Sequence, residues 1–379
     1  MRGSARRGET LPPRAVAFGA VETTSPIPLR ELTTLRLGGP AGRLVEARDE
    51  AAVVDAVRRA DRAGEPLLVL AGGSNVVVAD EGFAGTVLRI ATRGIARADG
   101  EDGRVRVEVQ AGEPWDPLVA RCVADGLAGV ECLSGIPGSV GATPIQNVGA
   151  YGQEVAETIR SVRVLDRARD EVAELGAAEC GFSYRSSAFK RTPGRWVVLA
   201  VGFELARSAQ SAPIRYAELA RRLGVQLGER APLGAVREAV LELRRGKGMV
   251  IDPADLDSVS AGSFFTNPVL EGEAFAALER RVAERLGDGV RPPAFPDADG
   301  RVKTSAAWLI ERAGFERGHG DPRGIAISAK HTLALTNRGA GSTTELVALA
   351  REIAGGVRNA FGVDLVPEPV FVGHAWDGG

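Results

Sequence analysis

A stretch of unusual composition, residues 135–152, offers the clearest chemistry in this sequence. It reads Gly-Ile-Pro-Gly-Ser-Val-Gly-Ala-Thr-Pro-Ile-Gln-Asn-Val-Gly-Ala-Tyr-Gly, with five glycines, two prolines and no charged residue. Glycine lets the backbone approach a ligand closely, and proline fixes the path of the chain. Gln146 and Asn147 add neutral donors and acceptors. The stretch suits a pyrophosphate held by amides beside a heteroaromatic ring. We favour this over an irregular surface loop because long structureless loops in compact domains are usually functional.

A second glycine turn, Ala71-Gly72-Gly73-Ser74-Asn75, stands between two apolar runs. Backbone amides in such a turn can form a nest for an anion, although the same pattern is often a simple strand connection. Gly339-Ala340-Gly341 imitates a dinucleotide-binding motif but lacks its third glycine. Ser342 and Glu345 predict a helix capping box there instead. The chain contains no Walker A motif.

The composition restricts the class of protein. The chain has 379 residues, with 47 basic and 49 acidic side chains and a formal net charge of −2. This balance argues against nucleic acid or an anionic membrane surface as the main partner. Cys122, Cys132 and Cys180 are an odd number without a CxxC pair, which is typical of a reduced, cytoplasmic protein. The three histidines all occur from position 319 onward, so we expect no metal site built from histidines.

Hydrophobic periodicity predicts the elements that must position these loops. Helical spacing is found at 49–63, 115–125, 233–246, 272–286, 304–313 and 342–358. Strands are predicted at 86–90 and 104–110 as neighbours, within 161–175 as a hairpin, and at 195–205, 331–336 and 365–372. The turn at 72–75 is expected to join two short buried strands within 66–78. We therefore predict an α+β protein, with two lobes, a hinge at 244–248 and a third domain.

Five motifs together resemble a known family. LAGGSNVVVAD, GIPGSVGATPIQNVGAYG, YRSSAFK, AGSFFTNP and VPEPVF occur in the order found in the UDP-N-acetylenolpyruvoylglucosamine reductases, across residues 28–373. The resemblance implies a two-lobed FAD-binding domain of the vanillyl-alcohol-oxidase type plus a C-terminal α+β substrate-binding domain. The implied division is a disordered tail at 1–19, FAD-binding lobes at 20–95 and 96–246, a substrate-binding domain at 247–360, and a closing strand at 361–379 that carries the active-site glutamate.

The resemblance also implies how the cofactor is held. FAD would be bound without a covalent link, because no histidine precedes His319 in the lobes that would carry it. Its contacts would come from the two glycine loops. The residues are Gly72, Gly73, Ser74, Asn75, Gly135, Ile136, Pro137, Gly138, Gly141, Ala142, Gln146, Asn147 and Gly149.

The implied reaction is the NADPH-dependent reduction of UDP-N-acetylglucosamine enolpyruvate to UDP-N-acetylmuramate for peptidoglycan. Hydride addition at the β-carbon leaves negative charge at the α-carbon, which a fixed cation or donor stabilises. By the resemblance, Arg185 binds the substrate carboxylate, Ser263 donates the proton to the α-carbon and Glu368 is the third catalytic residue. A carboxylate there helps only if it is protonated or bridged to Arg185, and burial would raise the pKa of Glu368 in that direction.

The resemblance extends to three substrate-binding residues: Tyr216 over the diphosphate end, Lys247 against phosphate, and Asn267. The chain departs from the family pattern at two positions. Val370 stands where many relatives have an arginine, and Arg244 or Arg245 is a candidate to supply that charge. Arg312 stands where many relatives have glutamine, so that position is left out of the site.

Two other functions stay open at this point. An FAD-dependent oxidase of the same fold needs a base that takes a proton from an alcohol, whereas the candidate site offers serine and arginine without a histidine. A catalytically silent flavin- or nucleotide-binding protein would keep FAD without activity. Beyond NADPH and the nucleotide sugar, we expect no nucleic acid, no membrane insertion and no obligate protein partner.

Overall fold

Lobe 1 is a four-stranded sheet covered by one helix. The computed structural model describes residues 19–23 and 27–376, so the tail predicted at 1–19 lies outside the described residues apart from Gly19. The strands lie in the order β1 (Val21–Thr23), β2 (Ala41–Ala47), β5 (Phe83–Ile90) and β3 (Leu67–Leu70). Helix α1 (Glu50–Ala63) begins where the Asp49 carboxylate accepts a hydrogen bond from the Ala52 amide, and it packs on β2 and β5. The helix predicted at 49–63 is confirmed.

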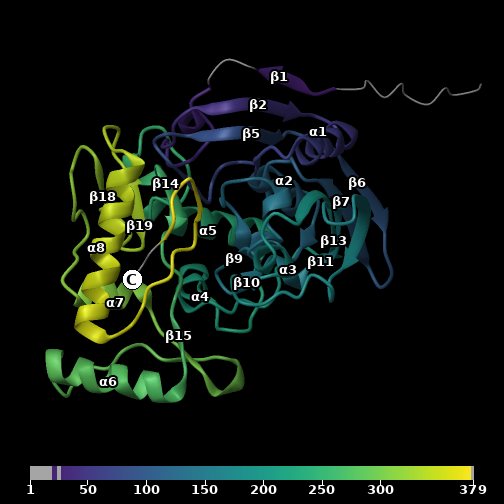
Figure 1. The fold of residues 1–379 in the computed structure, drawn as a ribbon. Coiled ribbons are helices and arrows are strands. Elements are labelled where there is room, and N and C mark those ends of the chain that lie inside the picture. Colours follow the sequence, from purple (N-terminus) through teal and green to yellow (C-terminus); the bar gives the residue numbers. More distant parts are fainter. Residues whose placement is uncertain (1–18, 24–26, 377–379) are drawn as a thin grey trace, which may run out of the picture.

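Lobe 2 is a larger antiparallel sheet (Figure 1). Its order is β12 (Glu171–Gly176), β11 (Ile159–Asp166), β13 (Trp196–Arg207), β7 (Arg104–Gln110) and β6 (Ile95–Asp99), and β8 (Leu127–Ala128) pairs with β13. The hairpin predicted within 161–175 is confirmed. Helix α2 (Trp115–Ala124) buries Trp115 and Leu118. Both join an apolar cluster that also contains Val53 and Val57 of α1, so the two lobes share one core.

The third domain has a separate core. Helices α4 (Ala217–Leu223) and α5 (Leu233–Gly246) pack together and precede it. Its central sheet has the order β14 (Ser260–Ser263), β19 (Ala334–Asn337) and β18 (Ile325–Ile327), and a smaller sheet has the order β15 (Val269–Leu270), β17 (Val302–Lys303) and β16 (Phe295–Pro296). Helices α6 (Gly272–Leu286), α7 (Ala306–Arg312) and α8 (Thr343–Phe361) complete it. The predicted capping box is confirmed, because Ser342 and Glu345 exchange hydrogen bonds at the start of α8.

The strand β20 (Val370–Val372) returns the chain to the first lobe. It pairs in parallel with β4 (Val76–Val78), the strand that directly follows the 72–75 turn. This pairing brings the segment that carries Glu368 beside the turn, since the Val370 amide donates to the Asn75 carbonyl at 2.9 Å. Figure 1 shows this last segment running between the third domain and the lobes.

One predicted strand arrangement is confirmed and another is wrong. The 72–75 turn joins two short strands as predicted, β3 and β4, although β3 belongs to the lobe 1 sheet and β4 pairs with β20. The strands predicted at 86–90 and 104–110 are not neighbours, because β5 lies between β2 and β3 whereas β7 lies between β13 and β6. Strand pairing depends on partners distant in sequence, which the local hydrophobic pattern does not reveal.

The remaining short elements lie in the loops that connect the longer ones. They are α3 (Ala188–Arg191), the strands β9 (Gly149–Ala150) and β10 (Gln153–Glu154), and short 3-10 turns at Leu29–Glu31, Glu131–Leu133, Val140–Ala142, Val155–Glu157, Leu256–Ser258 and Ala298–Gly300. Within residues 19–23 and 27–376, no helix is long and apolar enough to cross a membrane.

Candidate functional site

The two glycine loops predicted to hold the cofactor lie against each other. A Cβ atom placed on Gly72 would lie 2.6 Å from the Cα of Gly138, so neither loop leaves room for a side chain at this contact. The Ser74 hydroxyl donates to the Pro137 carbonyl at 3.1 Å. The Asn75 amide donates to the Gln146 side-chain oxygen at 2.9 Å. The structure therefore brings residues 72–75 and the 135–146 stretch into one place.

Several other predicted cofactor residues shape the two loops or fasten them to the rest of the protein. Gly73 has a φ of +59°, and a Cβ there would lie 1.8 Å from the Leu32 carbonyl oxygen, so its role is to make the turn. Gly141 is pressed against Ala111, and Ile136 packs on the lobe core, which turns both toward the protein interior. Asn147 is buried, with a φ of +48°, and its amide donates to Glu154 at 2.7 Å and to the Ser183 carbonyl at 3.1 Å. Asn147 thus fastens the loop to the segment that carries Arg185.

Helix α2 holds the glycine-rich loop from behind. The Asp116 carboxylate accepts the Gly135 amide at 2.6 Å and two bonds from the Arg237 guanidinium at 2.6 and 2.9 Å. The Trp115 amide donates to the Gly138 carbonyl at 3.0 Å, and its indole donates to the Leu133 carbonyl at 3.0 Å. The bonds from Arg237 and Gly135 lower the pKa of Asp116 and outweigh the opposing effect of burial. Sequence reasoning missed Asp116, because nothing local marks it as a partner of residue 135.

Two buried polar atoms beside this loop lack partners in the described structure. They are the Ser139 hydroxyl oxygen and the Nε of Arg244. The Arg244 Nε lies 3.4 Å from the position a Cβ on Gly135 would occupy. Burying a polar group without a hydrogen bond is costly, so such atoms point to a missing partner. A pyrophosphate-bearing cofactor such as FAD fits these donors and the glycine cradle. Of the two arginines suggested for this charge, Arg244 is therefore the better placed.

The three predicted catalytic residues lie together. The Glu368 amide donates to the Phe264 carbonyl at 2.8 Å, and Phe265 forms an antiparallel bridge with Pro367, which sets Glu368 beside the end of β14 where Ser263 lies. The Arg185 Nε lies 3.2 Å from the Glu368 Oε1. The Asn75 amide also donates to the Glu368 carbonyl at 3.3 Å. This cluster thus borders the 72–75 turn directly.

The charges in this cluster are mostly withdrawn from water. The side chains of Arg185 and Glu368 are only 21 % and 14 % exposed. Burial raises the pKa of Glu368, and the positive charges of Arg185 and Lys190 oppose that rise. Burial likewise lowers the pKa of Lys190, and Glu368 opposes that change. The site is therefore a buried group of charges in which the proton on Glu368 depends on its two cationic neighbours.

The predicted substrate residues fall into two groups. Asn267 accepts the Ala306 amide through its side-chain oxygen at 3.0 Å, and it lies beside Tyr184, the neighbour of Arg185. Tyr216 and Lys247 lie at α4 and α5. Lys247 pairs with Glu218 at 2.6 Å, and Tyr216 contacts the edge of Tyr151 with ring centroids 5.3 Å apart. Tyr216 is 40 % exposed, which is not the burial of a core tyrosine.

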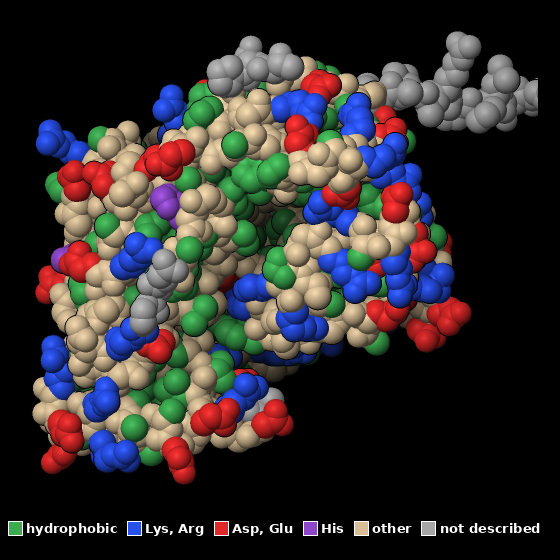
Figure 2. Space-filling view, in the orientation of Figure 1, with side chains coloured by type: hydrophobic (Ala, Val, Ile, Leu, Met, Phe, Trp, Pro, Cys, Tyr) green, Lys and Arg blue, Asp and Glu red, His purple; other side chains and the backbone are tan. Residues whose placement is uncertain are grey.

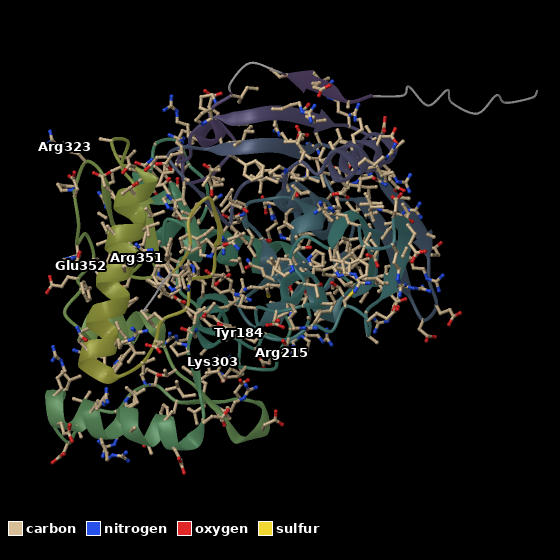
Figure 3. All side chains as sticks on the ribbon, in the orientation of Figure 1. Tyr184, Arg215, Lys303, Arg323, Arg351 and Glu352 are labelled. Carbon is tan, nitrogen blue, oxygen red and sulfur yellow. The ribbon has the colours of Figure 1, made fainter. Side chains whose placement is uncertain are left out.

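Two cations near these groups, Lys303 and Arg317, were missed from the sequence. The ammonium of Lys303 lies 4.6 Å from the centre of the Tyr184 ring, and Figure 3 shows the two side chains approaching from the third domain and lobe 2. The positive charges of Lys247, Arg317 and Arg244 act on His331, although Glu218 opposes them. Burial and these charges lower the pKa of His331 to about 4. Such a concentration of cations suits an anionic ligand, and Figure 2 shows the surface hollowed between lobe 2 and the third domain.

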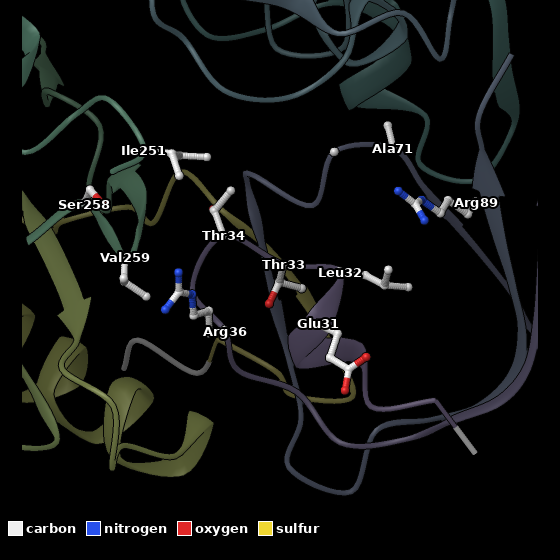
Figure 4. Close-up of a pocket in the computed structure, with 11 residues that line it drawn as sticks. Glu31, Leu32, Thr33, Thr34, Arg36, Ala71, Arg89, Ile251, Ser258 and Val259 are labelled. Carbon is white, nitrogen blue, oxygen red and sulfur yellow. The ribbon is translucent and has the colours of Figure 1, made fainter. Parts of the chain in front are cut away.

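A cavity of about 240 Å³ adjoins the same glycine turn from the lobe 1 side. It is lined by Ala71 and Gly72, by residues 31–34 and Arg36, by Arg89, and by Ile251, Ser258 and Val259 (Figure 4). Neither the 135–152 loop nor the Arg185–Glu368 pair contributes to its lining. The cavity therefore borders the predicted cofactor turn without containing the predicted reaction site.

Comparisons with known proteins give a family and a fold. A family model described as "FAD binding domain" matches residues 41–176. A second, "UDP-N-acetylenolpyruvoylglucosamine reductase, C-terminal domain", matches residues 252–372. The chain is 60 % identical over 347 residues to a UDP-N-acetylenolpyruvoylglucosamine reductase of Thermobifida fusca, covering 92 % of this chain and 97 % of that protein. It is 58 % identical over 375 residues to the protein of that name from Streptomyces coelicolor, covering 99 % and 96 %.

A solved structure has the same fold. The crystal structure of UDP-N-acetylenolpyruvylglucosamine reductase from Thermus caldophilus matches with a TM-score of 0.62 and 23 % identity. The match covers 93 % of this chain and 100 % of that chain. The two-lobed arrangement with a third domain is therefore one that a solved protein also adopts.

Proposed function

The chain belongs to the UDP-N-acetylenolpyruvoylglucosamine reductase family, and we propose that it reduces UDP-N-acetylglucosamine enolpyruvate to UDP-N-acetylmuramate, a peptidoglycan precursor. The enzyme is an FAD-dependent oxidoreductase, with FAD bound non-covalently and NADPH as the hydride donor. The observation that carries the proposal is the meeting of Arg185, Glu368 and the Ser263 strand beside the two glycine loops.

The two loops hold the cofactor in this proposal. Residues 72–75 and the 138–139 part of the second loop present backbone amides to its pyrophosphate, and Arg244 adds a positive charge from behind Gly135. Bound FAD supplies the hydride exchange between NADPH and the enolpyruvyl group. On this division, residues 20–95 and 96–246 form the cofactor lobes, 247–360 the substrate domain, and 361–379 the segment that completes the site.

The chain's own residues stabilise the negative charge that develops on the substrate and supply the proton. The Arg185 guanidinium binds the substrate carboxylate, where negative charge grows as the β-carbon gains its hydride, so this contact strengthens in the transition state. Ser263 gives its hydroxyl proton to the α-carbon. Glu368, held against Arg185, helps when it carries a proton, because a neutral carboxyl donates a hydrogen bond without adding repulsion.

The nucleotide end of the substrate is anionic, and the cations suit it. Lys247 and Tyr216 bind the diphosphate in this proposal, with Arg317 adding to the field around His331. Asn267 and Lys303 lie beside Tyr184, next to Arg185, and contact the sugar end. We also place the enzyme in the cytoplasm, which is supported by three cysteines that form no disulfide.

The visible spectrum of the FAD-loaded, anaerobic protein tests the proposal in one cuvette. One equivalent of NADPH is added first, and UDP-N-acetylglucosamine enolpyruvate second. We expect the flavin band to bleach with NADPH and return with the nucleotide sugar. If only oxygen restores the band, the protein is an oxidase of the same fold. If no flavin band forms after reconstitution, the assignment of residues 72–75 and 135–149 is wrong.

A further inference from the structure

The segment that carries Arg185 is a strained tight turn. Ser183 and Ser186 exchange two backbone hydrogen bonds of 3.0 and 3.1 Å, so Tyr184 and Arg185 occupy the corner between them. Arg185 has a φ of +51°, in the left-handed region that favours glycine. A non-glycine residue there is strained and persists only where its surroundings hold it. The contacts that hold Arg185 therefore decide where its guanidinium points.

One of those contacts comes from Lys190, a residue that the proposed reaction does not use. The Nζ of Lys190 donates to the Arg185 carbonyl at 3.0 Å. Lys190 lies in the short helix α3, where the Ser187 hydroxyl accepts the Lys190 amide at 3.2 Å and itself donates to the Ile145 carbonyl of the glycine-rich loop. The lysine is thus fixed at its backbone to the cofactor loop and at its ammonium to the arginine turn.

The positive charge of Lys190 also acts on the Glu368 carboxylate. Lys190 and Arg185 are the two cations that act on Glu368, and Glu368 in turn acts on Lys190. On the other side of Arg185, the guanidinium donates to the Gly149 carbonyl at 2.7 Å, near Glu154, and the Tyr184 phenol completes the surroundings. Lys190 is therefore half-buried among charges whose balance matters for the proposed chemistry.

We propose that Lys190 is a positioning residue for this reaction: its ammonium holds the Arg185 turn in the left-handed conformation and supplies a second positive charge to the Arg185–Glu368 pair. The inference rests on the function proposed above, because only a reaction at that pair makes its geometry matter. Without Lys190, the turn loses a charge-assisted bond to its strained residue, and Glu368 loses one of its two cations. Both changes act on the step that uses Arg185 and leave the cofactor loops in place.

Lys190→Met in the full-length, FAD-loaded enzyme tests this. Displacing a binding group by about 1 Å can cost about 100-fold in rate, so we expect kcat with the enolpyruvyl substrate to fall roughly 10- to 100-fold. Reduction of the flavin by NADPH alone should stay within about twofold. The limb of the pH profile that belongs to Glu368 should move to higher pH, because a nearby cation has been removed. Lys190→Arg, which keeps the charge, should recover a large part of the activity.

Arg191→Met is the matched control, because Arg191 is an exposed neighbour in the same helix that bonds to Ser186 rather than to Arg185. It should leave kcat and the pH profile unchanged. Wild-type kcat and an unshifted profile in Lys190→Met would overturn the inference. So would an equal loss in flavin reduction, which would indicate general damage. Should Lys190→Met not bind FAD, Lys190→Gln is measured instead, and the same two results decide. If the wild-type enzyme itself does not turn over the substrate, the proposed function fails instead.

Discussion

At the scale of single residues, the proton on Glu368 is the central question. Its side chain is 14 % exposed and lies 3.2 Å from Arg185, and burial raises its pKa. A protonated carboxyl and a carboxamide have the same shape and can each donate a hydrogen bond. The choice between the two charge states can therefore be tested by substitution.

We expect Glu368→Gln to keep much more activity than Glu368→Ala. If the carboxyl acts in its protonated form, the amide preserves its hydrogen bond, whereas alanine removes it and costs about 100-fold or more in kcat. Steady-state kinetics on both FAD-loaded variants give the ratio. Equal losses in the two variants would show that the charge of Glu368, rather than its proton, is required.

A second prediction at this scale concerns His331 and stability. Burial and neighbouring cations lower its pKa from 6.5 to about 4, so the unfolded chain binds this proton more tightly than the folded one. The contribution of His331 to stability is then fully present above pH 6.5 and is lost as the pH falls toward 4, by at most about 3 kcal/mol. Urea unfolding between pH 7 and pH 4 measures it. His331→Gln should lose less stability over this interval, and identical slopes in the two proteins would contradict the assignment.

At the scale of elements, the close contact between the two glycine loops sets how their backbones are placed in the proposed cofactor site. The backbones meet so closely at Gly72 and Gly138 that a methyl group added to Gly72 would force them apart. Gly72→Ala should therefore weaken FAD binding by at least about tenfold, because the amides of both loops move away from one ligand. Fluorescence titration of the apoprotein with FAD gives the dissociation constants.

The control for that titration is Gly355→Ala. Gly355 lies inside α8, where a Cβ atom meets nothing within 4 Å, so alanine fits and favours the helix. This variant should bind FAD with wild-type affinity. Unchanged affinity in Gly72→Ala as well would mean that the turn does not contact the cofactor.

The elements also show what the sequence can and cannot predict. The helices at 49–63, 115–125 and 233–246 are found as Glu50–Ala63, Trp115–Ala124 and Leu233–Gly246, because caps and 3.6-residue periodicity are local signals. The pairing of β4 with β20 joins residues almost 300 positions apart, and no local pattern indicates it.

The same limit applies to the site. The glycine loops and the three catalytic candidates could be found because they lie in contiguous motifs. Asp116 and Lys303 could not, because each acts through a contact with a distant segment. Lys190 lies within the YRSSAFK motif, but only the fold of the turn shows that its ammonium bonds to the Arg185 carbonyl. The left-handed conformation of Arg185 could not be predicted from the sequence either, because arginine rarely adopts it.

At the scale of the whole molecule, a group of hydrogen bonds, here called the clasp, joins Asp80 and Val78 of the first lobe to the start of α8 in the third domain. The Asp80 carboxylate accepts the amides of Thr343 and Thr344 at 2.8 and 2.9 Å, at the start of α8, and the Thr343 hydroxyl donates to the Val78 carbonyl at 2.6 Å. These bonds lower the pKa of Asp80 despite the opposing effect of burial. A lobe 1 residue thus helps to cap a helix of the third domain.

Asp80→Ala should lower the free energy of unfolding by about 1–2 kcal/mol, the usual cost of losing a helix cap, and should loosen the third domain against the lobes. Thermal and urea denaturation measure the first effect, and hydrogen exchange at the start of α8 measures the second. Asp55→Ala, at an exposed position on α1, is the control and should change neither. Unchanged exchange in Asp80→Ala would show that the clasp does not hold the domains together.

The parallel pairing of β20 with β4 has a consequence for how the enzyme is made. A ribosome synthesises the chain from its N-terminus, so lobes 1 and 2 and most of the third domain emerge before Glu368 does. During that time β4 lacks its strand partner, and its free edge can pair with another chain. Arrival of β20 then covers the edge and delivers the glutamate to Arg185 in one event. On the proposed function, a nascent chain that stalls before this strand lacks its active-site glutamate and leaves a strand edge open to aggregation at the same time.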